Sequence, residues 1–246
     1  LTATGDARLG GVVAALGESA AGNATITAGR DLIAKQDGQV QAAGTLTARA
    51  DRDLYAAGAL SSVGDMALAA ARDARVDGTA ATDADLTLTG RDIAVGATGL
   101  AQAGRSLIAT AQDSLQVAGR LLAGGAQSLT AGGRMTVDGT VAALQGDLSL
   151  HAQGGDLSLG VDSRLQAGGS LTAQAGGALS AFGAAAAEQG MTLRAGTDAT
   201  LGGIAATQAG DLIVNAGGKL SVLEDARLQL SLIHISEPTG LGMISY

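Results

Sequence analysis

The amino-acid sequence predicts an all-β chain wound as a right-handed parallel β-helix, a solenoid with coils of about 21 residues. Two observations carry this prediction. First, a small residue followed by alternating apolar and polar residues recurs along the chain at a nearly constant spacing. Second, aromatic residues make up 1% of the 246 residues whereas glycine numbers 39, a composition that suits a narrow interior of thin layers. Alanine favours helix locally, but each glycine costs about 1 kcal/mol relative to alanine inside a helix.

The repeat is counted at the small residue that precedes each alternating segment. These residues are Gly22, Gly44, Gly64, Ala84, Gly104, Gly125, Gly146, Gly169, Gly190 and Gly210. Their mean spacing is about 21 residues, and residues 1–21 have the pattern of one more unit. Strands this short cannot bury a face alone, so successive units must stack, with each strand paired to its copy one coil away.

Within a unit, the segment "GTLTARADRDLYAAGALSSV" at 44–63 shows the pattern most clearly. Leu46 and Ala48 alternate with polar residues, which is the period of two expected of a strand with one buried face. Residues 85–96 repeat this alternation twice around a turn. We therefore expect two or three short strands per unit. Inward positions should form apolar ladders along the rod, among them Leu32, Leu54 and Ile93.

Stacked coils about 4.8 Å apart give some eleven units a length of roughly 50 Å. Other solenoids fit less well. Leucine-rich repeats need an Asn or Cys ladder, left-handed helices need a six-residue period, and calcium-binding nonapeptides need G-G-x-G-x-D. The sequence has none of these features. Residues 1–229 are thus predicted to be one β-helix shaft, followed by a non-repeat tail at 230–246.

Composition narrows the classes of function. The 23 acidic and 15 basic residues give a net charge of −8, which argues against a nucleic-acid or anionic-membrane surface. The lack of cysteine excludes disulfides, zinc fingers and thiol nucleophiles. The sequence has no run of about 18 apolar residues, so it predicts no membrane-spanning helix. The chain begins at Leu1 without a charged-then-apolar leader, so we expect it to be an internal piece of a longer protein.

Several units resemble the filamentous haemagglutinin repeats of bacterial exoproteins. The clearest are "GDLSLHAQGGDLSLGVDSRLQAGG" at 146–169, "GSLTAQAGGALSA" at 169–181 and "AGRDLIAKQDGQVQAAG" at 28–44. The phrasing "G-x-L-x-L-x-A-G-x-D-L" recurs in most units, and the resemblance spans residues 1 to about 229. That large family includes adhesins and contact-dependent growth-inhibition proteins exported by two-partner secretion.

The resemblance implies a secreted, surface-attached rod that presents adhesive or toxic modules. It also implies an outer-membrane two-partner-secretion transporter as a partner, and a host or bacterial surface receptor that is reached through modules outside this chain. We predict no cofactor, and the net charge of −8 predicts no nucleic-acid partner. The adhesin and toxin-delivery roles are not separated by the sequence.

An acidic column is the most prominent candidate site. It consists of Asp31, Asp53, Asp73, Asp92 and Asp113, which fall at nearly the same place in five successive units. Stacked carboxylates are possible calcium ligands. Four of them directly follow an arginine, namely Arg30, Arg52, Arg72 and Arg91. Because these cations offset the repulsion and aspartate favours turns, we predict a solvated turn ladder and no metal site.

The runner-up interpretation is a β-helix that binds or cleaves polysaccharide. The paired carboxylates Asp51 with Asp53, and Asp83 with Asp85, are its candidate catalytic groups. Sugar hydrolysis also needs a cleft, which aromatic platforms and long loops usually build, and the units vary by only a few residues. We therefore predict no catalytic residues.

Four further features have simpler interpretations. His151 lies in the expected strand "LSLHA" without a second histidine or a cysteine nearby, so we expect an exposed or partly covered strand residue. Tyr55 and Phe182 are expected to pack or to occupy corners. Residues 181–190, "AFGAAAAEQG", interrupt the alternation and are expected to leave the rod as a small loop or helical turn.

The tail from Leu230 to Tyr246 lacks the repeat and contains the single proline, Pro238, where strands should stack. A capping segment is one explanation. However, "LSLIHISEPT" resembles the translation of a sequencing-library adapter, CTG TCT CTT ATA CAC ATC TCC GAG CCC ACG. The last three residues match the adapter's later ATC TCG TAT, and Gly240 stands where the adapter gives Arg. We predict that 230–246 is an artefact of sequence assembly.

Overall fold

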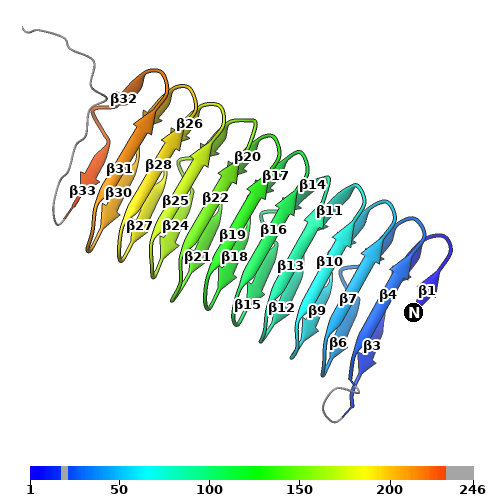
Figure 1. Cartoon of the computed structure of the whole chain (residues 1–246). Coiled ribbons are helices and arrows are strands. Elements are labelled where there is room, and N and C mark those ends of the chain that lie inside the picture. Colours follow the sequence, from blue (N-terminus) through cyan, green and yellow to red (C-terminus); the bar gives the residue numbers. More distant parts are fainter. Residues whose placement is uncertain (18–21, 231–246) are drawn as a thin grey trace, which may run out of the picture.

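The structure is a computed structural model, and it describes residues 1–17 and 22–230. Figure 1 shows a straight rod in which short strands follow one another from one end to the other. All regular structure in the described ranges is β-strand, arranged in three parallel sheets of eleven strands each. The predicted parallel β-helix is thereby confirmed, with three strands in each coil. Its right-handed sense stays a prediction that rests on the preference of parallel crossovers.

Each sheet takes one strand from every coil. Sheet 1 contains β1 (Thr2–Ala3), β4 (Ala24–Ala28), β7 (Leu46–Ala50), β10 (Met66–Ala70), β13 (Leu86–Gly90), β16 (Leu107–Ala111), β19 (Gln127–Ala131), β22 (Leu148–Ala152), β25 (Leu171–Ala175), β28 (Met191–Ala195) and β31 (Leu212–Ala216). Sheet 2 contains β2 (Ala7–Leu9), β5 (Leu32–Ala34), β8 (Leu54–Ala56), β11 (Asp73–Val76), β14 (Asp92–Val95), β17 (Leu115–Val117), β20 (Met135–Val137), β23 (Leu157–Leu159), β26 (Leu179–Ala181), β29 (Ala199–Leu201) and β32 (Leu220–Val222).

Sheet 3 closes the coil. It contains β3 (Val12–Ala15), β6 (Gln39–Ala42), β9 (Ala59–Ser62), β12 (Thr79–Thr82), β15 (Leu100–Ala103), β18 (Arg120–Ala123), β21 (Thr140–Ala143), β24 (Arg164–Ala167), β27 (Ala184–Ala187), β30 (Ile204–Thr207) and β33 (Arg227–Gln229). None of the described residues forms a helix long and apolar enough to cross a membrane.

The core lies inside the rod and follows from the register of the sheets. Leu46 pairs with Met66, and Met66 pairs with Leu86, so one inward position is apolar in successive coils. Neighbouring outward positions carry Thr, Arg or Ala, because successive side chains of a strand point to opposite faces. The predicted inward residues are at most 2% exposed, and they are Leu32, Leu54 and Ile93. The apolar ladders expected from the sequence are confirmed.

Residues 181–190 belong to the rod, which corrects the expected loop or helical turn. Strand β27 occupies Ala184–Ala187 and pairs in register with β24 and β30. Ala185 and Ala187 are buried whereas the other two alanines are exposed, so the alternation is present in space. It is invisible in the sequence because all four residues are alanine. Pairing in register with the neighbouring coils, and not local composition, makes this segment a strand.

A glycine column stands directly before sheet 3 in most coils. It consists of Gly11, Gly38, Gly58, Gly78, Gly99, Gly119, Gly139, Gly183 and Gly203, with Ser163 and Ala226 in the two remaining coils. A Cβ at Gly139 would overlap the carbonyl oxygen of Gly119 in the preceding coil. Among described glycines only Gly210 has a positive φ. The column therefore serves the close approach of one coil to the next, and not a left-handed backbone.

Replacing Gly139 by alanine should destabilise the rod by about 1 to 3 kcal/mol, because the added methyl group must move two coils apart. The matched control is Gly11→Ala. Gly11 holds the same position in the first coil, where a Cβ would meet nothing within 4 Å. Its replacement should change stability by no more than about 0.5 kcal/mol. Urea denaturation followed by circular dichroism measures both variants. Equal effects would contradict a role for the column in contacts between coils.

Candidate functional site

Polar residues line two of the three corners of the rod. The sheet 2 corner column is the set of residues that directly precede the register position of Leu32 and Leu54 in each coil. Asp73 and Asp92 are at the same time the first residues of β11 and β14. It reads Asp6, Asp31, Asp53, Asp73, Asp92, Ser114, Arg134, Asp156, Ala178, Asp198 and Lys219. The register of sheet 2 stacks these residues one per coil. The acidic column expected from the sequence is therefore a real spatial feature, and it begins one coil earlier, at Asp6.

One member of the predicted column is wrong. Ile93 pairs with Leu115, so Ser114 follows Asp92 in the column and Asp113 stacks on Arg91. The separation from Asp92 to Ser114 is 22 residues, whereas Asp73 and Asp92 are 19 residues apart. The coil that begins at β13 reaches sheet 2 one residue sooner than its neighbours, and this shift is not visible from aspartate spacing alone.

The column carboxylates bind the backbone of the following coil. In each case an Asp Oδ1 accepts a hydrogen bond from the N–H of the next column residue. The pairs are Asp53 with Asp73 (3.3 Å), Asp92 with Ser114 (3.2 Å), Asp156 with Ala178 (2.8 Å) and Asp198 with Lys219 (2.8 Å). Each carboxylate thus satisfies a corner N–H that lies next to the β-ladder.

The corner before sheet 1 uses the same device. Its column, here the sheet 1 corner column, includes Asn23, Thr45, Asp65, Asp85, Ser106, Ala126, Asp147 and Ser170. Side-chain oxygens again accept a hydrogen bond from the N–H of the column residue one coil later. The acceptor and donor pairs are Asn23 with Thr45 (2.8 Å), Asp65 with Asp85 (3.2 Å), Asp85 with Ser106 (2.9 Å) and Asp147 with Ser170 (2.8 Å). This column is not apparent in the sequence because its members vary among Asp, Asn, Ser and Thr.

Arginines neutralise the acidic columns in the first five coils. They reach an aspartate of the preceding coil or of their own, as in Arg30 to Asp6 (3.1 Å), Arg52 to Asp31, Arg72 to Asp53 (3.8 Å) and Arg91 to Asp92 (3.0 Å). Arg105 contacts both Asp65 (2.9 Å) and Asp85 (3.1 Å). The predicted offset of like charges is confirmed. Within the described ranges every ion pair lies between Asp6 and Arg105.

These contacts lower the pKa of column carboxyls. The hydrogen bond from Arg52 is the main cause for Asp31, whose pKa lies below its ordinary value. For Asp92 the main cause is the hydrogen bond from the Ser114 side chain, and Arg91 adds to it. Both effects favour the charged carboxylate. Asp31 and Asp92 therefore stay charged and bonded at neutral pH.

Calcium binding finds no support in this geometry. Calcium takes six to eight oxygen ligands, whereas the column oxygens already accept bonds from arginine and backbone N–H groups. Across residues 1–17 and 22–230, no group of three or more His, Asp or Glu side chains is placed to hold a metal ion.

Three of the four candidate glycosidase carboxylates are engaged in ion pairs, whereas Asp83 has none among the described residues. Asp51 lies 3.5 Å from Arg49, Asp53 pairs with Arg72, and Asp85 pairs with Arg105. These three thus have the surroundings of structural carboxylates.

The isolated aromatic and histidine residues lie on the surface of the rod. His151 is half-buried in β22, between Thr130 and Gln174 of the adjacent coils, as expected. Phe182 is a corner residue whose ring covers Gly202. Tyr55 points outward from β8, and a hydrogen bond to Asp77 raises the pKa of its hydroxyl. Asp77 also pairs with Arg75 at 2.8 Å, so these three side chains form one exposed cluster.

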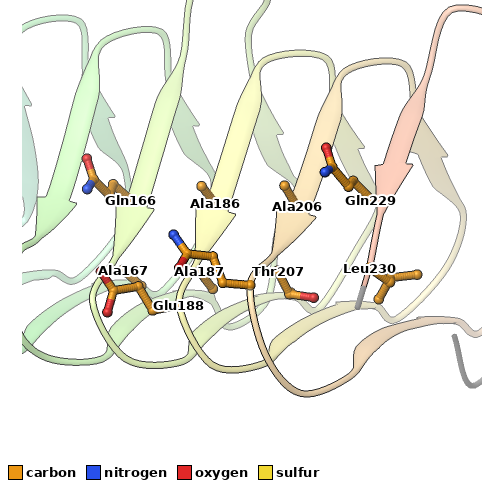
Figure 2. Close-up of a pocket in the computed structure, with 10 residues that line it drawn as sticks. Gln166, Ala167, Ala186, Ala187, Glu188, Ala206, Thr207, Gln229 and Leu230 are labelled. Atoms are coloured by element: carbon orange, nitrogen blue, oxygen red, sulfur yellow. The ribbon is translucent and has the colours of Figure 1, made fainter. Parts of the chain in front are cut away.

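Two open depressions lie on the outer face of sheet 3. Figure 2 shows one, of about 440 Å³, with Gln166 and Gln229 separated by the small residues Ala186 and Ala206. The other, of about 400 Å³, repeats this order with Gln41, Ser61, Ala81 and Gln102. Short side chains between two glutamines produce both hollows. Their described walls carry no aromatic side chain and one acid each, Glu188 or Asp83.

The hydrogen bonds of the Asp92 carboxylate predict a pH-dependent contribution to stability. The folded-state pKa is lowered, so this contribution is present above the unfolded pKa of about 3.9 and is lost as pH falls through the folded value. Asp92→Asn should cost about 0.5 to 1.5 kcal/mol at pH 7, and the cost should shrink below about pH 4. Denaturation with urea at both pH values measures it.

Asp113→Asn is the control for Asp92→Asn. It removes the same charge one coil away, where the described residues offer the carboxylate no ion pair or side-chain hydrogen bond. Its effect should stay within about 0.5 kcal/mol at either pH. If both variants behave alike, net charge and not the corner contact governs the response.

Comparison with known proteins agrees with the repeating geometry of the rod. The model of the haemagglutinin repeat family matches residues 19–90, 73–139 and 143–223, which together make up well over half of the chain. Searches of curated proteins and of solved structures found no match. The repeat of this family is structural and non-enzymatic, and its proteins are secreted, surface-associated exoproteins. With its coil length, its three parallel sheets and these matches, the chain belongs to the haemagglutinin repeat family.

Proposed function

We propose that the chain is a structural rod segment of a secreted bacterial surface exoprotein, and that the rod presents adhesive or toxic modules at a distance from the outer membrane. The observation that carries this proposal is the unbroken register of all three sheets through eleven coils. A rod of this kind fixes the distance between its ends, because every coil adds the same rise.

The export route and partners of the proposal come from the family. Proteins of this family are exoproteins of the two-partner-secretion type, so an outer-membrane transporter is the proposed export partner. A receptor on a host or bacterial cell would be contacted by modules outside this chain. The lack of cysteine supports passage as an unfolded thread, since no disulfide has to be formed or opened.

A spacer experiment tests the rod function. A surface protein that carries this chain between an outer-membrane anchor and a labelled epitope should hold the epitope roughly 50 Å further from the membrane. Deleting residues 86–170 joins Asp85 to Leu171 and removes four coils in register, because Leu86 and Leu171 hold the same sheet 1 position. The epitope should then move about 19 Å closer. Energy transfer to a membrane dye measures the distance.

The control deletion, residues 86–178, joins Asp85 to Leu179 and places a sheet 2 strand where a sheet 1 strand belongs. It should fail to fold. If it folds and shortens the spacer like the in-register deletion, the rod does not depend on stacking. Specific binding or cleavage of a polysaccharide by the chain itself would instead favour the runner-up function.

We also propose that 230–246 is not part of the natural protein. Residues 231–246 lie outside the described residues, so this proposal rests on the adapter-like sequence. Amplification from source DNA with primers outside the region decides it. Further repeats after Leu228 would support the proposal. Codons for "SLIHISEPTGLGMISY" followed by a natural stop would overturn it.

A further inference from the structure

One buried amide interrupts the apolar interior of the rod. Gln127 is 2% exposed, and neither its Nε2 nor its Oε1 has a hydrogen-bond partner. It occupies an inward position of sheet 1, in register between Leu107 and Leu148. The same position is apolar in the other described coils from β4 to β31. A buried polar side chain without a partner lowers stability by its full desolvation cost.

The corner contacts are missing at the same place. Ala126 occupies the sheet 1 corner column and Arg134 the sheet 2 corner column, so neither offers an acceptor to the N–H of the next coil. Side-chain hydrogen bonds between coils are present up to Ser114 and resume at Asp147. Within the described residues, the coil at 126–146 is joined to both of its neighbours by the backbone ladders and the packing of its core.

We infer that this coil, the Gln127 coil (residues 126–146), is the first interior coil to open when the rod unfolds locally. In a solenoid, stability is close to a sum of terms for each coil and each interface between neighbours. The Gln127 coil combines the unfavourable interior term with two interfaces that lack corner bonds. The rod is thereby divided into a block of coils before the Gln127 coil and a block of coils after it, and these two blocks separate at a defined position.

Hydrogen exchange of the full chain, followed by mass spectrometry, tests this inference. Backbone amides of β16, β19 and β22 should exchange about ten- to hundredfold faster than those of β7 and β10, which corresponds to the cost of an unpaired buried polar group. Gln127→Leu should slow the exchange of β16, β19 and β22 by a similar factor and leave β7 and β10 unchanged. Gln127→Met repeats the test with an unbranched side chain.

Two further variants make the result specific. Gln116→Leu applies the same chemical change to an exposed residue of β17 and should leave exchange unchanged. Ala126→Asn supplies an acceptor for the N–H of Asp147, as Asn23 does for Thr45, and should slow exchange severalfold at β19 and β22. Uniform exchange along the rod, or equal rates in the native chain and Gln127→Leu, would overturn the inference.

Discussion

The structure depends on parallel hydrogen bonding between each strand and its copy in the next coil. A strand of three to five residues buries too little surface to be stable alone, and the ladder solves this by repeating it eleven times in register. Once the register is set, inward leucines, alanines and valines stack on their equivalents. This explains how a chain with 1% aromatic residues maintains a continuous core.

The close rise of the ladder also determines which residues the corners accept. Before sheet 3 the backbone of one coil comes so near the previous coil that a side chain at Gly139 would overlap it. At the other two corners there is room for a short polar side chain, and carboxylates such as Asp92 and Asp147 bond the next N–H. Gly139 and Asp92 thus serve their corners for different physical reasons, although glycine and aspartate are both usually described as turn residues.

Much of this architecture could be predicted from the sequence, because hydrophobic alternation and coil length are directly visible in it. Leu32, Leu54 and Ile93 were identified as inward residues by alternation alone. Register was harder to predict. The coil of Asp92 reaches sheet 2 one residue early, whereas in the next coil the column position falls on Ser114 and Asp113 lies one residue before it. No local property of Asp113 reveals this. The strand Ala184–Ala187 was missed since identical residues carry no periodic signal. The missing partners of the Gln127 amide depend on three-dimensional packing and have no counterpart in the sequence.

The ion pairs of the described residues have a consequence for the environment in which the rod works. They occupy only the coils up to Arg105, and most of their arginine side chains are more than half exposed. Exposed ion pairs weaken as dissolved salt shortens the screening length, from about 10 Å at 0.1 M to about 3 Å at 1 M. The two ends of the rod therefore respond differently to salinity. Moving from a dilute to a saline medium weakens the ion pairs of the amino-terminal coils, while the described coils after Arg105 have no ion pair to lose and keep the apolar core that both ends share.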